Sequence, residues 1–175
     1  SYIAICGIRV ALRQSAHVLC SGSRFPAYMK IDKLRNLRWG QPTKSEYYNL
    51  EVKEEDFVNL YEYLKAEKKN IFIFPDFTIF YALLNVPSPQ PILWFHRGQT
   101  YPKAYDAKLD SWIVDDLIKN KVELVVLEEK YLFSQYLSLD DFPQLKTFIQ
   151  KNFVKTHQIG IFNIFKKNMA IFKLF

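Results

Sequence analysis

A chain of 175 residues has the length of one globular domain. Hydrophobic residues make up 49% of the sequence and aromatic residues 17%, whereas glycine occurs only five times. This composition excludes a disordered or low-complexity chain and predicts a packed core within a single domain that covers residues 1–175.

The net charge of +6 comes entirely from the first 40 residues, which hold seven basic side chains and one acidic side chain. No RNP, KH or zinc-finger pattern accompanies them, so we expect no nucleic-acid partner. A membrane-proximal flank explains the asymmetry better, because basic clusters beside anionic lipid head groups gain about 1 kcal/mol per charge. The start of the chain lacks the profile of a signal peptide, and we expect the chain to be a fragment of a longer protein.

Cys6 and Cys20 are the only cysteines, and they form neither a CxxC pair nor a zinc-ligand set with a nearby histidine. We therefore favour two buried thiols and expect no metal site. A disulfide between them stays open as an alternative, and it would require an oxidising compartment.

The elements are predicted from apolar periodicity, in chain order. Residues 3–12 fit either a strand or the end of a helix, and residues 34–39 fit a strand. The clearest helix covers residues 54–69, where apolar side chains recur with the helical period. Its residues expected in the core are Phe57, Leu60 and Leu64.

Residues 71–102 are apolar enough to suggest a membrane span. Six residues that a lipid-exposed helix would not carry together interrupt the segment: Pro75, Asp76, Asn85, Pro87, Pro89 and Pro91. We therefore predict a strand at 71–74, a short helix at 78–84, a proline-rich turn and a strand at 92–95, all in a buried core.

The last part of the sequence alternates in the same way. A helix at 106–119 leads into a strand at 122–127, whose run of β-branched residues and leucines, interrupted only by Glu123, is typical of a strand covered on both faces. A helix at 138–153 begins with a serine as candidate N-cap, and residues 158–166 and 170–175 fit an antiparallel hairpin. Further residues expected in the core are Trp112, Leu117 and Phe148.

Strands that alternate with helices of this length form βαβ units and a mostly parallel sheet. The final hairpin makes the sheet mixed. We therefore predict an α/β fold, a three-layer Rossmann-like sandwich whose mostly parallel sheet carries a C-terminal antiparallel hairpin.

The motifs by which such folds bind nucleotides or catalyse hydrolysis are missing from the sequence. The five glycines are scattered, so there is neither a GxGxxG fingerprint nor a P-loop, and GxSxG and HExxH are also absent. We therefore expect no cofactor, and we predict that the isolated chain is not catalytic.

Candidate ligand-binding residues follow the predicted strands, because ligands gather at the carboxyl ends of parallel strands. Asp76 follows the strand at 71–74, and Glu128 follows the strand at 122–127. His96, Arg97 and Tyr101 come after the expected strand at 92–95. These residues predict a polar pocket at one edge of the sheet.

A structural role is the alternative, and such roles are common for these residue types. Asp76 would then cap the helix that follows it, and Arg97 would pair with a nearby carboxylate. Glu128 and Glu129 fit a solvated turn, and Trp94, within the expected strand, is assigned to the core rather than to the site.

The order of the segments adds a resemblance to a known family. The chain carries, in sequence, Pro-Asp, FTIFYALLN, PSPQP, ILWFHRGQTYP, NKVELVVLEE and IGIFNIFKK. Over roughly residues 28–168 this order resembles the C-terminal soluble domain of polytopic membrane glycosyltransferases of the protein-mannosyltransferase-like kind, which use polyprenyl-phosphate-linked sugars.

The resemblance implies that a multi-helix membrane portion of the same polypeptide carries the catalytic acidic residues. It implies that this domain lies outside the cytoplasmic membrane, although basic flanks usually mark the cytoplasmic side. No catalytic residue of the family falls within this chain. A family tyrosine corresponds to Tyr81, which we expect to be a packing residue.

Two functions from different classes therefore remain open. The first is a non-catalytic extracytoplasmic domain of a membrane-bound glycosyltransferase-like protein, which shapes the access of a glycan acceptor or a polyprenyl-phosphate sugar. Its candidate ligand contacts are Asp76, His96, Arg97 and Tyr101. The second is a free-standing soluble α/β enzyme of small-molecule metabolism that uses Asp76, His96 and Arg97 in a strand-end pocket.

Overall fold

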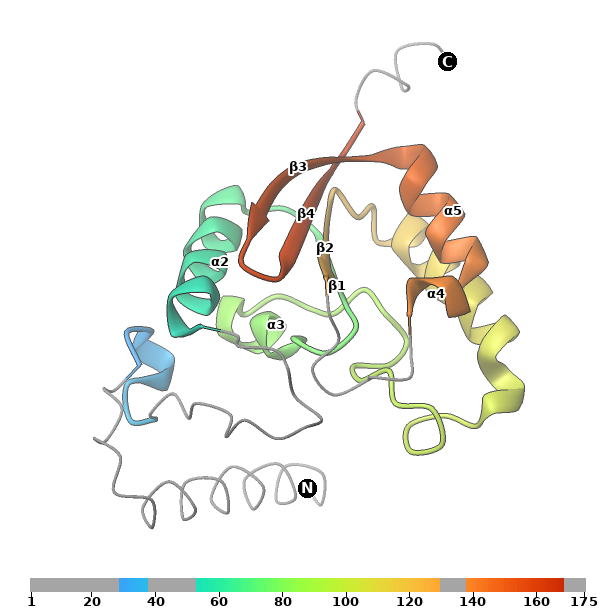
Figure 1. The fold of residues 1–175 in the computed structure, drawn as a ribbon, viewed down its shortest axis with the longest axis horizontal. Helices are drawn as coiled ribbons and strands as arrows, with labels where there is room; N and C mark the ends of the chain where they lie inside the picture. The colour runs from blue at the N-terminus through green and yellow to red at the C-terminus, as the bar shows by residue number, and fades with distance from the viewer. Residues whose placement is uncertain (1–28, 38–52, 130–137, 169–175) are drawn as a thin grey trace. The chain divides into compact units, whose positions relative to one another are not determined.

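The computed structural model describes residues 29–37, 53–129 and 138–168 (Figure 1). The chain divides into two compact units, Ser1–Glu54 and Glu55–Phe175. In the first unit a 3-10 turn, η1, covers Asp32–Leu34, and the backbone N–H of Met29 donates to the carbonyl oxygen of Leu37.

This turn replaces the start of the strand expected at 34–39. The backbone N–H of Leu37 donates to the carbonyl oxygen of Leu34, which folds the chain back locally and leaves no extended run to pair. The strand prediction is therefore wrong over residues 34–37. Residues 3–12, Cys6 and Cys20 lie outside the described residues.

A four-stranded mixed sheet with the order β1-β2-β4-β3 forms the centre of the second unit (Figure 1). Strand β1 (Ile71–Phe74) is parallel to β2 (Leu124–Glu128), which is antiparallel to β4 (Phe162–Lys167). Strand β4 is in turn antiparallel to β3 (Phe153–Ile159). The α/β class and the C-terminal hairpin are confirmed, but the prediction of a mostly parallel sheet is wrong, because only β1 and β2 run in parallel.

The missing parallel strand is the one expected at 92–95. Pro91, directly before this segment, has no N–H to donate to a ladder. Leu93 and Trp94 are 57% and 41% exposed, and only Phe95 is fully buried. The segment is therefore irregular, and the ring of Phe95 is its one fully buried side chain. The expectation that Trp94 belongs to the core is wrong.

Tyr81 satisfies a backbone donor of β1, the edge strand of the sheet. Its hydroxyl accepts a hydrogen bond from the N–H of Ile73 at 2.9 Å and donates one to Oε1 of Gln90 at 2.9 Å. Burial raises the pKa of Tyr81, so the hydroxyl keeps the proton that it donates. The residue is buried as expected, but it also pairs an edge N–H that would otherwise lack a partner in the core.

Helices cover both faces of the sheet (Figure 1). Helices α2 (Glu54–Glu67) and α3 (Ile79–Leu84) lie on one side. Helices α4 (Asp106–Lys119) and α5 (Pro143–Asn152) lie on the other. The strands β1 and β2 are consequently buried along almost their whole length, as their continuous apolar sequences predicted.

The helices at 54–69, 78–84 and 106–119 are confirmed to within two residues at each end. Helix α2 ends at Glu67, and Lys68 follows with a φ of 50°, which stops the helical path. Strand β2 begins at Leu124, two residues later than predicted, with Val122 buried just before it.

The region predicted as one helix at 138–153 consists of two elements. A 3-10 turn, η3 (Leu139–Asp141), precedes α5, because Pro143 has no N–H to continue a helix and starts a new one. Ser138 is confirmed as an N-cap, although of η3. Its Oγ accepts from the N–H of Asp140 at 3.1 Å, and Asp141 accepts from the N–H of Ser138 at 2.7 Å.

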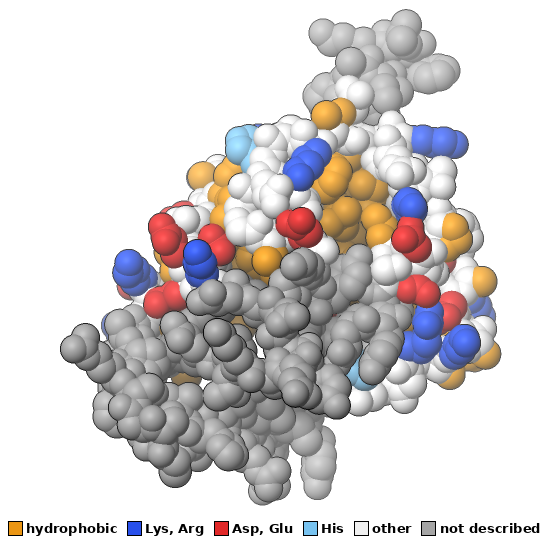
Figure 2. Space-filling view, viewed as in Figure 1, with side chains coloured by type: hydrophobic (Ala, Val, Ile, Leu, Met, Phe, Trp, Pro, Cys, Tyr) orange, Lys and Arg blue, Asp and Glu red, His pale blue; other side chains and the backbone are white. Residues whose placement is uncertain are grey.

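The hairpin lies earlier in the chain than predicted. The chain reverses at Gly160, whose φ of 53° belongs to the left-handed region that glycine adopts without strain. Residues 158–166 therefore hold the turn rather than one strand, and residues 170–175 lie outside the described residues. Strand β3 is exposed over most of its length, and Figure 2 shows hydrophobic side chains at the surface between the hairpin and α5.

Two aromatic-rich cores fill the layers. Between the sheet and helices α2 and α3, Phe57 lies 4.6 Å from Phe80 and Phe77 lies 5.1 Å from Phe162, measured between ring centroids. The core on the α4–α5 side includes Phe72, Phe74, Phe95, Leu109, Ile113, Leu117, Phe142, Leu145 and Ile149.

Five of the six predicted core residues face these cores. Leu60, Leu64 and Leu117 are almost fully buried, and Phe148 is partly buried against the α4–α5 core. Trp112 is the exception, since it is 43% exposed. The buried stripe of α4 runs through Leu109, Ile113 and Leu117, and Trp112 lies about 100° around the helix from Ile113.

A buried carboxylate joins α4 to the start of α5. Asp110 is 1% exposed, and its two oxygens accept hydrogen bonds from the N–H groups of Gln144 and Leu145, both at 2.9 Å. The N-cap of α5 is Phe142, which has no polar side chain to supply that contact. Asp110 thus serves as the cap of α5 from another helix.

Replacing Asp110 by alanine should lower the free energy of unfolding by about 2–4 kcal/mol, because two buried N–H groups lose their acceptors. Asn should cost less, since its carbonyl oxygen can still accept. Urea denaturation of the two variants measures this difference. Asp115→Ala, at an exposed position of the same helix, is the control and should change stability by less than about 0.5 kcal/mol. Equal losses at positions 110 and 115 would contradict the capping role.

Candidate functional site

The carboxyl ends of the parallel strands β1 and β2 lie side by side, with Phe74 opposite Leu127. Asp76 comes two residues after β1, and Glu128 is the last residue of β2. The peptide bond between Phe74 and Pro75 is cis. As the sequence predicted, this edge of the sheet therefore brings two carboxylates together.

Glu128 binds the backbone of the β1–α3 loop, which covers residues 75–78. Its Oε1 accepts hydrogen bonds from the N–H of Asp76 at 2.7 Å and from the N–H of Phe77 at 2.9 Å. Its Oε2 is buried without a hydrogen-bond partner among the described residues. The carboxyl group is thus an acceptor for two amides of a loop that lies about 50 residues away in the sequence.

The expectation that Glu128 lies in a solvated turn is wrong, since the residue is only 3% exposed. It still belongs to β2 and pairs with Phe162 of β4, which keeps its side chain inside the fold. The turn begins one residue later. Glu129 accepts a hydrogen bond from Nε2 of Gln158 at 2.9 Å, in an exposed contact.

The surroundings of Glu128 favour its neutral form. Burial and the negative charge of Asp76 raise the pKa of Glu128 to about 8, and the two amide hydrogen bonds offset this only in part. A carboxyl group with a pKa in this range can gain and lose a proton near neutral pH, which is the property required of a general acid or base.

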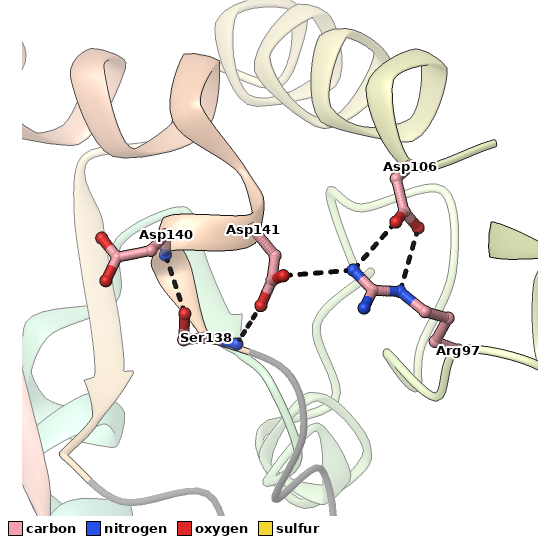
Figure 3. Close-up of polar contacts among 5 residues, drawn as sticks. All are labelled: Arg97, Asp106, Ser138, Asp140 and Asp141. Carbon is pink, nitrogen blue, oxygen red and sulfur yellow. Dashed lines mark hydrogen bonds and ion pairs between the residues drawn. The ribbon is translucent and has the colours of Figure 1, made fainter. Parts of the chain in front are cut away.

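Arg97 holds two parts of the chain together rather than lying free at a strand end (Figure 3). Its Nη2 lies 2.8 Å from Oδ2 of Asp106, in the first turn of α4, and 3.2 Å from Oδ1 of Asp141, in η3. Its Nε donates to Oδ1 of Asp106 at 3.3 Å, which makes the contact with Asp106 bidentate. This is the pairing with a carboxylate that the structural alternative predicted.

The charges in this cluster stabilise one another. Partial burial disfavours the charge on Asp141, but hydrogen bonds from the Ser138 backbone and from Arg97 outweigh it and lower the pKa of Asp141. Partial burial likewise disfavours the charge on Arg97, and the hydrogen bonds to Asp141 and Asp106 raise its pKa above the ordinary value. The Arg97 side chain is 27% exposed, so these ion pairs are only partly screened by solvent.

The side chains of His96 and Tyr101, the two other predicted site residues near Arg97, lie in different environments. Tyr101 is 7% exposed and belongs to the α4–α5 core, where burial raises its pKa. The His96 ring packs edge-on against Trp94, with the ring centroids 5.4 Å apart, and its Nδ1 is buried without a hydrogen-bond partner among the described residues. Gly98, with a φ of 83°, closes a turn that brings Tyr101 back beside Arg97.

Four of the five predicted site residues therefore fall into two groups, Asp76 with Glu128 and Arg97 with Tyr101, and His96 packs apart from them against Trp94. Sequence reasoning missed the two partners of Arg97, although both carried a local signal. Asp141 completes the capping box that begins at Ser138, and Asp106 lies in the first turn of a predicted helix, where acidic residues are favoured.

Sequence reasoning also missed an exposed aromatic face on α4. Trp112 on α4 is 43% exposed, and Tyr105, which ends the 3-10 turn η2 (Lys103–Tyr105) and is the N-cap residue of α4, is 45% exposed. Lys108 lies between them, with its Nζ 5.7 Å from the centroid of the Tyr105 ring and 4.7 Å from that of the Trp112 ring. These three residues are called the α4 aromatic surface below.

Residues 89–97, called the strap below, are tied to both ends of α4 and carry further exposed apolar side chains. Near one end of the helix, Nδ2 of Asn120 donates to the carbonyl oxygen of Pro89 at 3.4 Å, and at the other end Arg97 binds Asp106. The exposed Leu93 and Trp94 lie in the part of the chain between these two anchors.

Comparison with known proteins finds no family, no curated protein and no solved structure that matches this chain. Within the described ranges, no helix combines the length and the apolar character needed to cross a membrane. The same residues contain no group of three or more His, Cys, Asp or Glu side chains placed to hold a metal ion.

Replacing Arg97 by alanine should lower the free energy of unfolding by about 1–3 kcal/mol, because it leaves two partly buried carboxylates without their cation. A double-mutant cycle with Asp141→Ala should give a coupling energy of about 1 kcal/mol. Lys65→Ala is the control, since Lys65 and Glu62 form an exposed pair at 3.9 Å that should contribute less than about 0.5 kcal/mol. Strictly additive effects at positions 97 and 141 would contradict the ion-pair assignment.

Proposed function

We propose that this chain is a non-catalytic, extracytoplasmic domain of a membrane-bound glycosyltransferase-like protein, in which it shapes the access of a glycan acceptor or a polyprenyl-phosphate sugar. The order of segments that resembles such proteins gives the functional class. The observation that carries the proposal is the α4 aromatic surface, because it offers a place for that ligand on a domain of this kind.

The chemistry of this surface suits a sugar linked to a phosphate. The C–H faces of a saccharide pack on exposed aromatic rings, and Tyr105 and Trp112 present such rings on either side of Lys108. Lys108, held between them, supplies a point charge that attracts a phosphate group. Leu93 and Trp94 on the neighbouring strap add apolar area for a lipid chain.

Two residues that the sequence suggested as ligand contacts or as part of a strand-end pocket bind other parts of this chain instead, which favours a structural role for them over a catalytic one. Arg97 binds Asp106 and Asp141, and Oε1 of Glu128 binds the β1–α3 loop. On this proposal the fold is a Rossmann-like sandwich with few parallel strands. The carboxyl ends of β1 and β2, where such folds usually bind ligands, serve to hold the loops in place, and the ligand is bound at α4 instead.

The binding surface can be tested by titrating the isotope-labelled chain with a short-chain polyprenyl-phosphate mannose while recording the indole N–H signals. The signal of Trp112 should shift on binding, and Trp112→Ala should weaken binding about tenfold, as expected for the loss of one stacked ring. Ile118→Ala is the matched control, because Ile118 is 58% exposed on the same helix but is not part of the α4 aromatic surface.

Absence of any shift at millimolar probe would contradict the proposal, as would equal weakening by the two substitutions. Thermal denaturation of both variants shows whether a loss of binding reflects a loss of folding. Because positions 112 and 118 are both exposed, each substitution should leave the melting temperature almost unchanged.

The membrane context is tested separately. We expect the reading frame upstream of Ser1 to encode several hydrophobic spans. A reporter enzyme that is active only outside the cytoplasm, fused after β4, should then be active in cells. A start codon near Tyr2, or a reporter active only in the cytoplasm, would contradict this part of the proposal.

A second function is favoured by one specific observation, the buried Glu128 beside Asp76. On this alternative the chain is a free-standing soluble α/β enzyme of small-molecule metabolism, with Glu128 as general acid or base and with Asp76, His96 and Arg97 around it. Turnover of a small metabolite by the isolated chain that is lost in Glu128→Gln, while folding is retained, would favour this alternative.

A further inference from the structure

The side chain of Glu128, on the central strand β2, holds the β1–α3 loop by hydrogen bonds to two successive amides. The loop leads directly into α3, whose residues Phe80 and Tyr81 are buried in the core. Freeing the loop from Glu128 would therefore loosen the start of α3 as well.

We propose that Glu128 is a proton-dependent latch, which holds the β1–α3 loop against β2 while its carboxyl group is neutral and releases the loop when the group ionises. The geometry supports this assignment in two ways. Oε1 is fully used by the two amides, so the proton belongs on Oε2, and Oε2 is buried without an acceptor or a cation among the described residues. An ionised Glu128 would thus leave a buried negative charge that the two amides compensate only in part.

The charged groups around the latch reinforce the effect. Asp76, in the loop itself, places a negative charge near Glu128. Helix α3 carries no charged residue, and Phe162, Asn163 and Ile164 on the facing strand β4 are also uncharged. Helix α2, whose Phe57 packs 6.2 Å from the ring of Phe77 in the loop, begins with three acidic residues, Glu54, Glu55 and Asp56. Among the described residues, Asp76 is the charged group that acts on Glu128, and it opposes ionisation.

The direction of the pH response follows from proton linkage. In the closed loop the pKa of Glu128 is about 8, whereas in an open loop the carboxyl group reaches water and its pKa returns to about 4.3. Between these two values the closed state binds more protons than the open state. Stability of the closed loop is therefore complete below about pH 4.3 and is lost as the pH rises through about 8.

Amide hydrogen exchange in the 175-residue chain tests the latch. The N–H of Phe77 bonds to Glu128 and reports on the closed loop directly, whereas amides in the middle of α4 serve as an internal reference. After correction for the intrinsic exchange rate at each pH, protection of the Phe77 amide should fall up to about tenfold per pH unit between pH 5.5 and 7.5.

Two substitutions make the test specific. Glu128→Gln cannot ionise, so protection at Phe77 should become independent of pH. Asp76→Asn removes the neighbouring charge but keeps the backbone N–H, so the fall in protection should level off at a lower pH. The α4 amides should behave alike in all three proteins.

Protection at Phe77 that does not change with pH in the wild-type chain would overturn the proposal, as would the same pH dependence in Glu128→Gln. Should Glu128→Gln fail to fold, carboxyl-carbon NMR of the wild-type chain decides the matter. A titration of Glu128 at about pH 4.3 would overturn the latch, and one near pH 8 that moves down in Asp76→Asn would support it.

Discussion

Burial of the parallel β1–β2 pair on both faces is the constraint on which the rest of this fold depends. All four residues of β1 are buried, as are four of the five residues of β2. Backbone polar groups in such a position need partners within the protein, because water cannot reach them. Tyr81 supplies a partner to the edge of β1, and Glu128 supplies one to the loop that leaves β1. The neighbouring elements are thus tied to the strands by polar contacts as well as by packing.

The two buried carboxylates act in the same way at different places. Asp110 accepts from two amides at the start of α5, and Glu128 accepts from two amides just before α3. Asp110 replaces the local cap of α5 with a side chain from a distant element, whereas Glu128 binds two amides that precede Thr78, the N-cap residue of α3. They differ in their surroundings. Asp110 uses both of its oxygens, whereas Glu128 uses one oxygen and faces the charge of Asp76, so that its neutral form is favoured.

These contacts determine which polar side chains are used within the protein and which remain exposed at its surface. At the carboxyl ends of β1 and β2, where open α/β sheets usually bind ligands, Glu128 holds the β1–α3 loop, and Arg97, after the irregular segment at 92–95, pairs with Asp106 and Asp141. The exposed rings of Tyr105, just before α4, and of Trp112, on α4, lie on either side of Lys108, and this is where we propose that the ligand binds.

The sequence by itself determined the elements whose signals are local. Helices α2 and α4 repeat their apolar residues with the helical period and carry acidic first turns, and β1 and the first four residues of β2 are continuous apolar runs. The capping box at Ser138 is equally local. Only the tertiary structure decided whether residues 92–95 pair as a strand, which way Trp112 faces, and whether Glu128 meets water. Each of these depends on which distant surface lies opposite, and neighbouring residues in the sequence do not contain that information.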